Sequence, residues 1–308
     1  ALVAAGLGFK MALVPFHAWT PDVYQGAPTI VTSVLAVASK AAGFAVVLRV
    51  FYVGLRGAEG YIANDWSIMF GVLAALSMTF GNLAALMQTD VKRLLGYSSI
   101  AQAGNIAVGL AAVTTGSTAG PSGVLFFLGT YVATNLGAFV CVMAISQRIG
   151  SDNIRDYAGL SKRSPWLAGI LTLCLLSLTG IPPTAGFWAK LYVFNSAIQA
   201  SGKSEFVSNL GAQMAGAPPA AKALVDGVVE RWLVIVVVVA VLNTAISAFY
   251  YLRWARTMIL DEPAESTRLS VPGAVQGVLA LAAAGVLIFS VDPTPLIAAA
   301  QHAAGALQ

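Results

Sequence analysis

The stretch Gly180–Phe194, GIPPTAGFWAKLYVF, lies inside a long apolar segment and yet contains two consecutive prolines and a lysine. Proline removes a helix hydrogen bond and its ring clashes with the preceding turn, so Pro182 and Pro183 interrupt any helix through this segment. In a membrane, freed backbone groups must be buried in protein or line water. The stretch therefore predicts a broken helix with a polar pocket, and Lys190 lies a few residues beyond the break.

The composition indicates an all-α polytopic membrane protein. Of the 308 residues, 58% are hydrophobic and 10% are charged, with a mean hydropathy of +0.79, whereas a soluble domain is about 25% charged. The net charge of +4 is then a matter of membrane topology. No basic patch interleaved with aromatic residues indicates nucleic-acid binding, and no Gly-rich phosphate loop or dinucleotide fingerprint is present. Cys141 and Cys174 lack metal-ligand spacing.

Eight apolar stretches are long enough to span a bilayer, which takes about 20 residues. They are approximately 1–19, 27–55, 66–88, 93–114, 121–147, 166–198, 232–254 and 271–291. The polar connection 199–231 is rich in Ala, Gly and Pro, and a short surface helix can form there. Nine Lys and Arg residues fall on one side and five on the other, so the positive-inside rule places 89–92, 148–165 and 255–270 in the cytoplasm.

Three lysines, Lys10, Lys40 and Lys190, fall near the middle of predicted spans, whereas every acidic residue lies in a loop or at a span edge. A lysine at the bilayer centre costs about 2.5–3.5 kcal/mol. Burial disfavours the charged form of an amine, so a lysine there can exchange a proton, which arginine cannot do. The alternative is that the span boundaries are misplaced and the lysines snorkel.

A second break is predicted in the first span, where Pro15 follows Lys10 by five residues. Discontinuous helices near the midplane mark ion sites in transporters. A simple proline kink would explain the prolines but not the nearby lysines. We therefore expect two discontinuous helices, each with a lysine beside its break.

Further candidates surround these lysines. His17 follows Pro15 and is a possible proton relay at the cytoplasmic end, although a packed histidine is equally plausible. The helical stretch LLGYSSIAQAGN contains hydroxyl and amide groups that can hold water or simply bond helices together: Tyr97, Ser98, Ser99 and Gln102. Asn243 and Thr244 allow the same two interpretations.

Five motifs resemble the antiporter-like membrane subunits of respiratory complex I. They are GFKMALVPFHAWTPDVYQGAPT, TSVLAVASKAAGFAVVLRVF, DVKRLLGYSSIAQAG, LTGIPPTAGFWAKLYVF and NTAISAFYYLR. The TPDVYQGAP wording and the lysine in ASK resemble the subunit N branch of bacterial NADH:quinone oxidoreductase. The resemblance covers essentially the whole chain.

The resemblance implies a fourteen-helix fold with two inverted five-helix repeats, of which this chain would supply the seventh to fourteenth helices. Residues 1–55 would close the first repeat, 66–254 form the second, and 271–308 hold the last transmembrane helix and a tail. Six helices would precede residue 1, including one with a glutamate that pairs with Lys10. Many members have histidine at the position of Gln102, which cannot carry a proton, so water held by its side chain would have to substitute.

By this resemblance the chain is a proton-translocating subunit of a bacterial plasma membrane, with Lys10, Lys40 and Lys190 on its central axis. NADH, FMN, iron–sulfur clusters and quinone would belong to other subunits, with no cofactor or metal in this chain. Its partners would be the bilayer and other membrane subunits of the complex, including neighbouring antiporter-like subunits.

Two other functions compete with this interpretation. One is a subunit of a multi-subunit sodium/proton antiporter of the same fold, although those subunits usually read LPDAH where this chain has TPDVYQGAP. The other is a structural membrane scaffold, which would gain nothing from three buried lysines.

Overall fold

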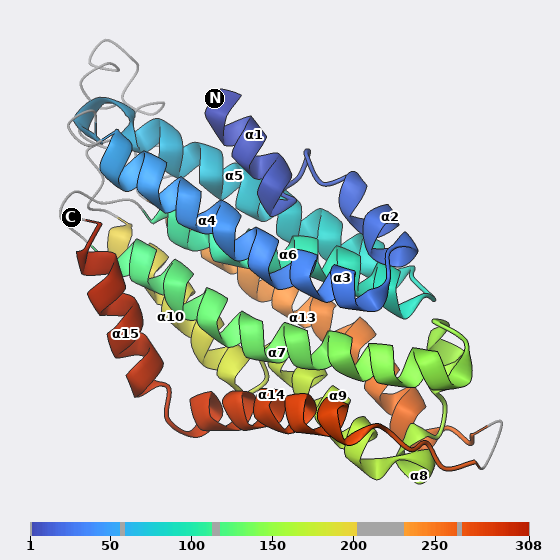
Figure 1. The fold of residues 1–308 in the computed structure, drawn as a ribbon. Helices are drawn as coiled ribbons and strands as arrows, with labels where there is room; N and C mark the ends of the chain where they lie inside the picture. Colours follow the sequence, from blue (N-terminus) through green and yellow to red (C-terminus); the bar gives the residue numbers. More distant parts are fainter. Residues whose placement is uncertain (1, 56–58, 113–117, 202–230, 264–266, 308) are drawn as a thin grey trace.

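The computed structural model describes residues 2–55, 59–112, 118–201, 231–263 and 267–307, with side chains from Trp66 onward in the first helix after residue 58. Every regular element in this part of the chain is a helix, and the long helices lie roughly side by side (Figure 1). The prediction of an all-α fold is confirmed. The expected surface helix within 199–231 falls largely outside the described residues.

The first predicted break is present. Helix α1 (Leu2–Met11) ends, an irregular segment follows, and α2 (Trp19–Gly26) begins. After α2 the chain forms a long helical stretch in four consecutive parts: α3 (Thr29–Val34), η1 (Leu35–Ser39), α4 (Lys40–Leu48) and η2 (Arg49–Gly54). Both η1 and η2 are π-helical turns, which often mark functional sites. The first of them ends directly before Lys40.

The next three helices are α5 (Glu59–Leu86), α6 (Val91–Ala111) and α7 (Ala119–Ile149). Helix α6 is buried without interruption from Ser98 to Ala111, because other helices surround it. Its many polar residues therefore meet protein and not lipid.

The second predicted break lies between α9 (Pro165–Thr179) and α10 (Ala185–Ala200). The short elements η3 (Ile154–Tyr157) and α8 (Leu160–Arg163) precede it, and α13 (Trp232–Leu260) and α14 (Gly273–Val291) follow the described part of α10. All eight stretches that were expected to span contain helix.

The residues after the last span, which were expected to be a tail, contain a helix. Thr294–Gly305 forms α15. Figure 1 shows α15 turning away from the end of α14. Its apolar positions Leu296 and Ala300 recur at helical spacing and face the bundle, where Leu296 lies against Gly129 of α7. Alanine-rich helices show only a weak apolar stripe in a sequence, so this helix was not predicted.

Five helical stretches in the described residues are long and apolar enough to cross a membrane: 29–54, 66–86, 119–149, 232–260 and 273–291. Helices α1 and α9 are shorter apolar helices, as expected for halves of broken spans. The chain is therefore a multi-span membrane protein.

The three connections that carry the excess of basic residues meet at one end of the bundle. The amide of Val91 donates to the carbonyl of Asp152 at 2.8 Å, and the amide of Gly159 donates to Thr257 at 3.2 Å. These connections therefore share one side of the membrane, as predicted from their charge. Their cytoplasmic location remains a prediction.

Candidate functional site

The break between α9 and α10 depends on two glycines. The amide of Gly180 donates to the carbonyls of Leu176 and Ser177, and its φ of 86° lies in the left-handed region that favours glycine. A Cβ atom on Gly180 would also lie 2.9 Å from Cδ of Lys190. At Gly186 a Cβ atom would lie 1.8 Å from the carbonyl oxygen of Ser177. These positions let the start of α10 and the stem of Lys190 approach the end of α9.

Lys190 is 5% exposed and lies on α10. Its Nζ donates to the carbonyl of Thr179, at the end of α9, at 2.7 Å, and to Oγ1 of Thr244, on α13, at 3.4 Å. The carbonyl of Thr179 is one that the end of a helix leaves without a helical partner. The break therefore supplies an acceptor for the buried amine, as the sequence predicted.

A small cavity lies beside Lys190. Its volume is about 10 Å³, on the scale of one water molecule. The lining residues come from α6, α7, α9 and α10: Gln102, Phe127, Thr130, Tyr131, Thr134, Ser177, Leu178, Gly186 and Lys190. Gln102 donates through Nε2 to the carbonyl of Leu178 at 2.8 Å, so it bonds to a second carbonyl at the end of α9.

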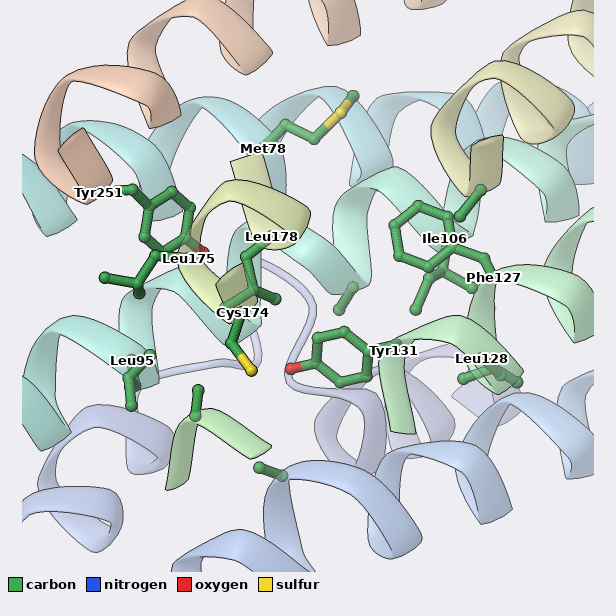
Figure 2. Close-up of a cluster of buried hydrophobic side chains, with 14 of the residues drawn as sticks. Met78, Leu95, Ile106, Phe127, Leu128, Tyr131, Cys174, Leu175, Leu178 and Tyr251 are labelled. Carbon is green, nitrogen blue, oxygen red and sulfur yellow. The ribbon is translucent and has the colours of Figure 1, made fainter. Parts of the chain in front are cut away.

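Helix α7 contributes four of the lining residues, which the sequence reasoning missed. Phe127, Thr130, Tyr131 and Thr134 recur at i, i+3, i+4 and i+7, the spacing of one helix face. Three of the four, Thr130, Tyr131 and Thr134, are polar, and these polar residues on one face of an apolar helix were the signal that could have found the stripe. Figure 2 shows the Tyr131 ring among apolar side chains, including Cys174 of α9.

Lys40 is 2% exposed and begins α4 directly after the π-helical turn η1. Its Nζ donates to both the carbonyl and Oγ of Ser99 on α6. Two tyrosine hydroxyls also reach Oγ of Ser99, Tyr131 at 3.2 Å and Tyr24 at 3.3 Å. A hydroxyl accepts two hydrogen bonds and donates one, so donors from Lys40 and Tyr131 and an acceptor at Tyr24 use its full capacity.

The two buried lysines are therefore joined by polar groups. Lys40 bonds to Ser99, Ser99 accepts from Tyr131, and Tyr131 lines the same cavity as Lys190. Of the four α6 residues that the sequence singled out, three make polar contacts near the lysines, each with a different partner. Ser99 contacts Lys40, Gln102 lines the cavity, and Ser98 bonds to the hydroxyl of Tyr251 on α13.

Tyr97 lies apart from this arrangement. Its ring lies 6.4 Å from that of Phe80, and the guanidinium of Arg93 lies 5.8 Å from its centroid. These contacts place Tyr97 on the side of α6 that faces α5. The structure brings it to neither buried lysine.

The side chain of Lys10 is exposed in the part of the chain that the structure describes, and its burial against the glutamate-bearing helix that the resemblance implies stays a prediction. Helix α1 packs one face on α4, where a Cβ atom on Gly43 would lie 3.4 Å from Cγ of Lys10, and leaves the other face open. The groups at the first break find other partners. Indole Nε1 of Trp19 donates to the carbonyl of Phe9 at 3.1 Å, and the amide of Val14 donates to Oγ of Ser77 at 2.9 Å.

His17 lies in the irregular segment between α1 and α2, two residues beyond Pro15. Its ring packs edge-on against Phe80, with centroids 4.6 Å apart. That contact favours the packed histidine, and its role as a relay stays a prediction.

Acidic partners are absent for both buried lysines within the described parts of the chain, where the ion pairs are Lys92–Asp152, Arg93–Asp22 and Lys162–Glu262. The same residues contain no group of three His, Cys, Asp or Glu that could hold a metal ion. The arrangement offers amines, hydroxyls and an amide, which can donate, accept and orient water.

Comparison with known proteins decides the family. The family model "NADH:quinone oxidoreductase/Mrp antiporter, TM" matches residues 1–212. The chain belongs to this family. Its resemblance to the antiporter-like subunits is therefore confirmed.

The chain is similar to several proteins named NADH-quinone oxidoreductase subunit N. The one from Desulforamulus reducens is 44% identical over 303 residues, which are 98% of this chain and 56% of the relative. A chain of respiratory complex I from Thermus thermophilus with bound aureothin is 33% identical at a TM-score of 0.71, covering 96% of this chain and 57% of that one. The chain thus spans about half the length of the curated relatives it matches.

The antiporter side of the family shares the fold. A chain of the Mrp complex from Dietzia sp. DQ12-45-1b superposes with a TM-score of 0.79 over 99% of this chain and 59% of that one. Its sequence identity is 19%, so the likeness concerns the fold alone.

Proposed function

We propose that this chain is part of a proton-translocating membrane subunit of NADH:quinone oxidoreductase. The observation that carries the proposal is the polar connection between two buried amines, from Lys40 through Ser99 and Tyr131 to the cavity at Lys190. The relatives named subunit N support the choice of complex.

In this proposal the amines of Lys40 and Lys190 exchange protons, and the groups between them carry or orient the transfer. Lysine suits the role because a desolvated amine can lose its proton, whereas a guanidinium keeps it. The cavity has room for about one water molecule, which would bridge Tyr131 and Lys190. Gln102 would orient that water and carry no proton itself.

The redox chemistry would take place elsewhere in the complex. NADH, FMN, the iron–sulfur clusters and quinone would bind to other subunits, and this chain would respond to them through neighbouring membrane subunits, including antiporter-like ones. The complex would lie in a bacterial plasma membrane. Lys10, His17 and the second half of the discontinuous helix near Pro15 would belong to the same proton path.

The second candidate is a subunit of a multi-subunit sodium/proton antiporter, because the family model covers both kinds of protein. Relatives at 38–44% identity named subunit N favour the first candidate. Purification of the full-length protein with redox subunits supports the first candidate, and sodium-dependent proton exchange without them supports the second.

The decisive test replaces Lys190 in the full-length protein within its complex. Lys190→Met keeps an unbranched chain of similar reach without charge, and Lys190→Arg keeps the charge without a readily lost proton. We expect both variants to assemble and both to lower the number of protons translocated per NADH oxidised in membrane vesicles. Ser196→Ala on the same helix is the matched control, because its hydroxyl bonds only within α10.

Each alternative role predicts a different result. If Lys190 serves only as a fixed charge, Lys190→Arg pumps normally, and if it serves only for packing, Lys190→Met pumps normally. Either result, with assembly verified separately, would overturn the proton-exchange role.

A further inference from the structure

A second buried polar cluster lies between α5 and α13, away from the cavity at Lys190. Asn82 and Asn243 are 2% and 4% exposed. Nδ2 of Asn82 donates to Oδ1 and to the carbonyl of Asn243, each at 3.1 Å. The hydroxyl of Tyr250 donates to Oδ1 of Asn82 at 2.9 Å, and Nδ2 of Asn243 donates to Oγ1 of Thr79 at 3.1 Å and to the carbonyl of Val239 at 3.0 Å. Every N–H group of the two side-chain amides therefore has an acceptor, and each amide oxygen has a donor.

The two amides bond to each other and to neighbouring side chains. We therefore consider a structural role for the cluster, in fixing the position of one helix on the other. Paired amides in an apolar interface hold two helices in one register, because any slip leaves them buried without partners. Polar side chains take the same role between membrane helices. The Asn82–Asn243 pair therefore has the properties of a register lock.

The contacts along the interface show which register is held. A Cβ atom on Gly71 would lie 2.8 Å from the Trp232 ring, and this contact joins residues separated by the same 161 positions as Asn82 and Asn243. Near the far end of both helices, Nη2 of Arg253 donates to the carbonyl of Gln88 at 3.0 Å. Helices α5 and α13 thus run parallel and meet at three successive levels.

The register matters because Thr244 directly follows Asn243. Its hydroxyl donates to the carbonyl of Ala240 at 3.0 Å and accepts from Nζ of Lys190 at 3.4 Å. A slip of α13 by one helical turn moves a residue by about 5.4 Å, which exceeds the reach of a hydrogen bond. Lys190 would then keep only its bond to the carbonyl of Thr179.

We propose that the Asn82–Asn243 pair is a positioning device that sets the register of α13 on α5 and so keeps the Thr244 hydroxyl on the amine of Lys190. The inference rests on the proposed function, because it assigns the pair a role in proton exchange at Lys190. Asn82 and Asn243 neither line the cavity nor bond to the amine, so the pair acts through the position of α13, on which Thr244 is the residue that bonds to Lys190.

The test is a mutant cycle in the full-length protein within its complex. The variants are Asn82→Leu/Asn243→Leu, which replaces both amides together, Thr244→Val, and the triple combination. Replacing both partners of a buried hydrogen bond by apolar groups can be nearly neutral for folding. Ser67→Ala is the matched control, because it removes a buried hydrogen bond from α5 to α6 at 2.7 Å without touching α13.

The measurement is the pH profile of protons translocated per NADH oxidised, with the amount of assembled complex determined separately. We expect the double Leu variant to shift the midpoint of the profile in the same direction and by about the same amount as Thr244→Val. The triple variant should show no further shift, because residues that act through one contact are not additive. The control should keep the normal midpoint.

A double Leu variant with normal pumping and a normal midpoint would overturn the inference. So would a triple variant in which the two shifts add. Both results are distinct from failure of the proposed function, which would appear as normal pumping in Lys190→Met. Asn82→Ala/Asn243→Ala gives a further check if the double Leu variant fails to assemble, because it also removes both amides together but adds no bulk, and it must shift the midpoint in the same direction.

Discussion

The two discontinuous helices use similar sequence elements with opposite results. In each, proline interrupts an apolar helix, Pro15 at the first break and Pro182 and Pro183 at the second, and a lysine lies nearby. At the second break the carbonyls at the end of α9 are taken by Lys190 and Gln102. At the first break Trp19 takes the carbonyl of Phe9, and Ser77 takes the amide of Val14. Lys10 is left exposed, whereas Lys190 is buried.

The difference follows from the order of the elements. Lys190 lies beyond its break, on the second half-helix, and its side chain reaches back to the carbonyl of Thr179. Side chains on a helix point toward its N-terminus, so a lysine early in α10 naturally reaches the end of α9. Lys10 lies before its break, so the same direction takes its side chain away from the interruption. In the described residues, the lysine that follows its break bonds to the freed carbonyl, and the lysine that precedes its break does not.

The sharpest way to break this comparison is Gly186→Ala at the second break. The new Cβ atom would lie 1.8 Å from a carbonyl oxygen of α9, so α10 has to move and the Lys190 site opens. We expect a loss of stability of about 1–3 kcal/mol or more and little assembled complex in the membrane. Gly169→Ala, on the exposed side of α9 with nothing within 4 Å, is the control. Full assembly with normal pumping in Gly186→Ala would contradict the close packing of the two half-helices.

A smaller effect is expected from Gly8→Ala at the first break. There a Cβ atom would lie 2.9 Å from a ring carbon of Phe16, and a side chain can shift where a backbone carbonyl cannot. We expect a modest fall in thermal stability of the complex, smaller than for Gly186→Ala. An equal or larger fall would mean that the two breaks are packed alike.

Two substitutions, Gln102→Leu and Ser77→Ala, test whether the polar groups at the two breaks differ in function. Each removes a partner of a freed backbone group, and a buried group without a partner costs about 1–3 kcal/mol. We therefore expect similar falls in stability. Proton translocation per NADH should fall only for Gln102→Leu, since only Gln102 lines the cavity at Lys190. Equal pumping defects in both variants would remove the distinction between the breaks.

The smallest effect is expected at the ion pair that joins α2, beyond the first break, to α6. Nη1 of Arg93 lies 2.6 Å from Oδ1 of Asp22, whose side chain is 72% exposed. Exposed pairs contribute about 0–1 kcal/mol. Asp22→Asn should change the stability of the complex by less than about 1 kcal/mol and leave pumping unchanged. A large pumping defect in this variant would give the first break a role that the exposed pair does not suggest.

The spans and both breaks could be predicted from the sequence, because apolar length and proline act on the backbone whatever surrounds them. The burial of Lys40 and Lys190 followed for the same reason. The contacts of Lys10 could not be predicted, since a position along a helix does not say which neighbour covers it. The π-helical turn before Lys40 has no sequence signature in LAVAS. Thr244 was noticed without a partner, because its contact with Lys190 depends on the register of two distant helices.

Helix α6 has a consequence for how the chain enters the membrane. Helix α6 is not among the described helices that are apolar and long enough to cross a membrane alone. Four polar residues lie along it: Ser98, Ser99, Gln102 and Asn105. Such a helix is poorly retained in a bilayer unless a partner covers its polar side chains. Those partners lie on other helices, since Ser99 bonds to Lys40 of α4, Gln102 to the carbonyl of Leu178 on α9, and Ser98 to Tyr251 of α13. We expect α6 to become stably placed in the membrane only after α9 and α13 have been synthesised, so that the most polar helix of the bundle depends on segments that follow it in the chain.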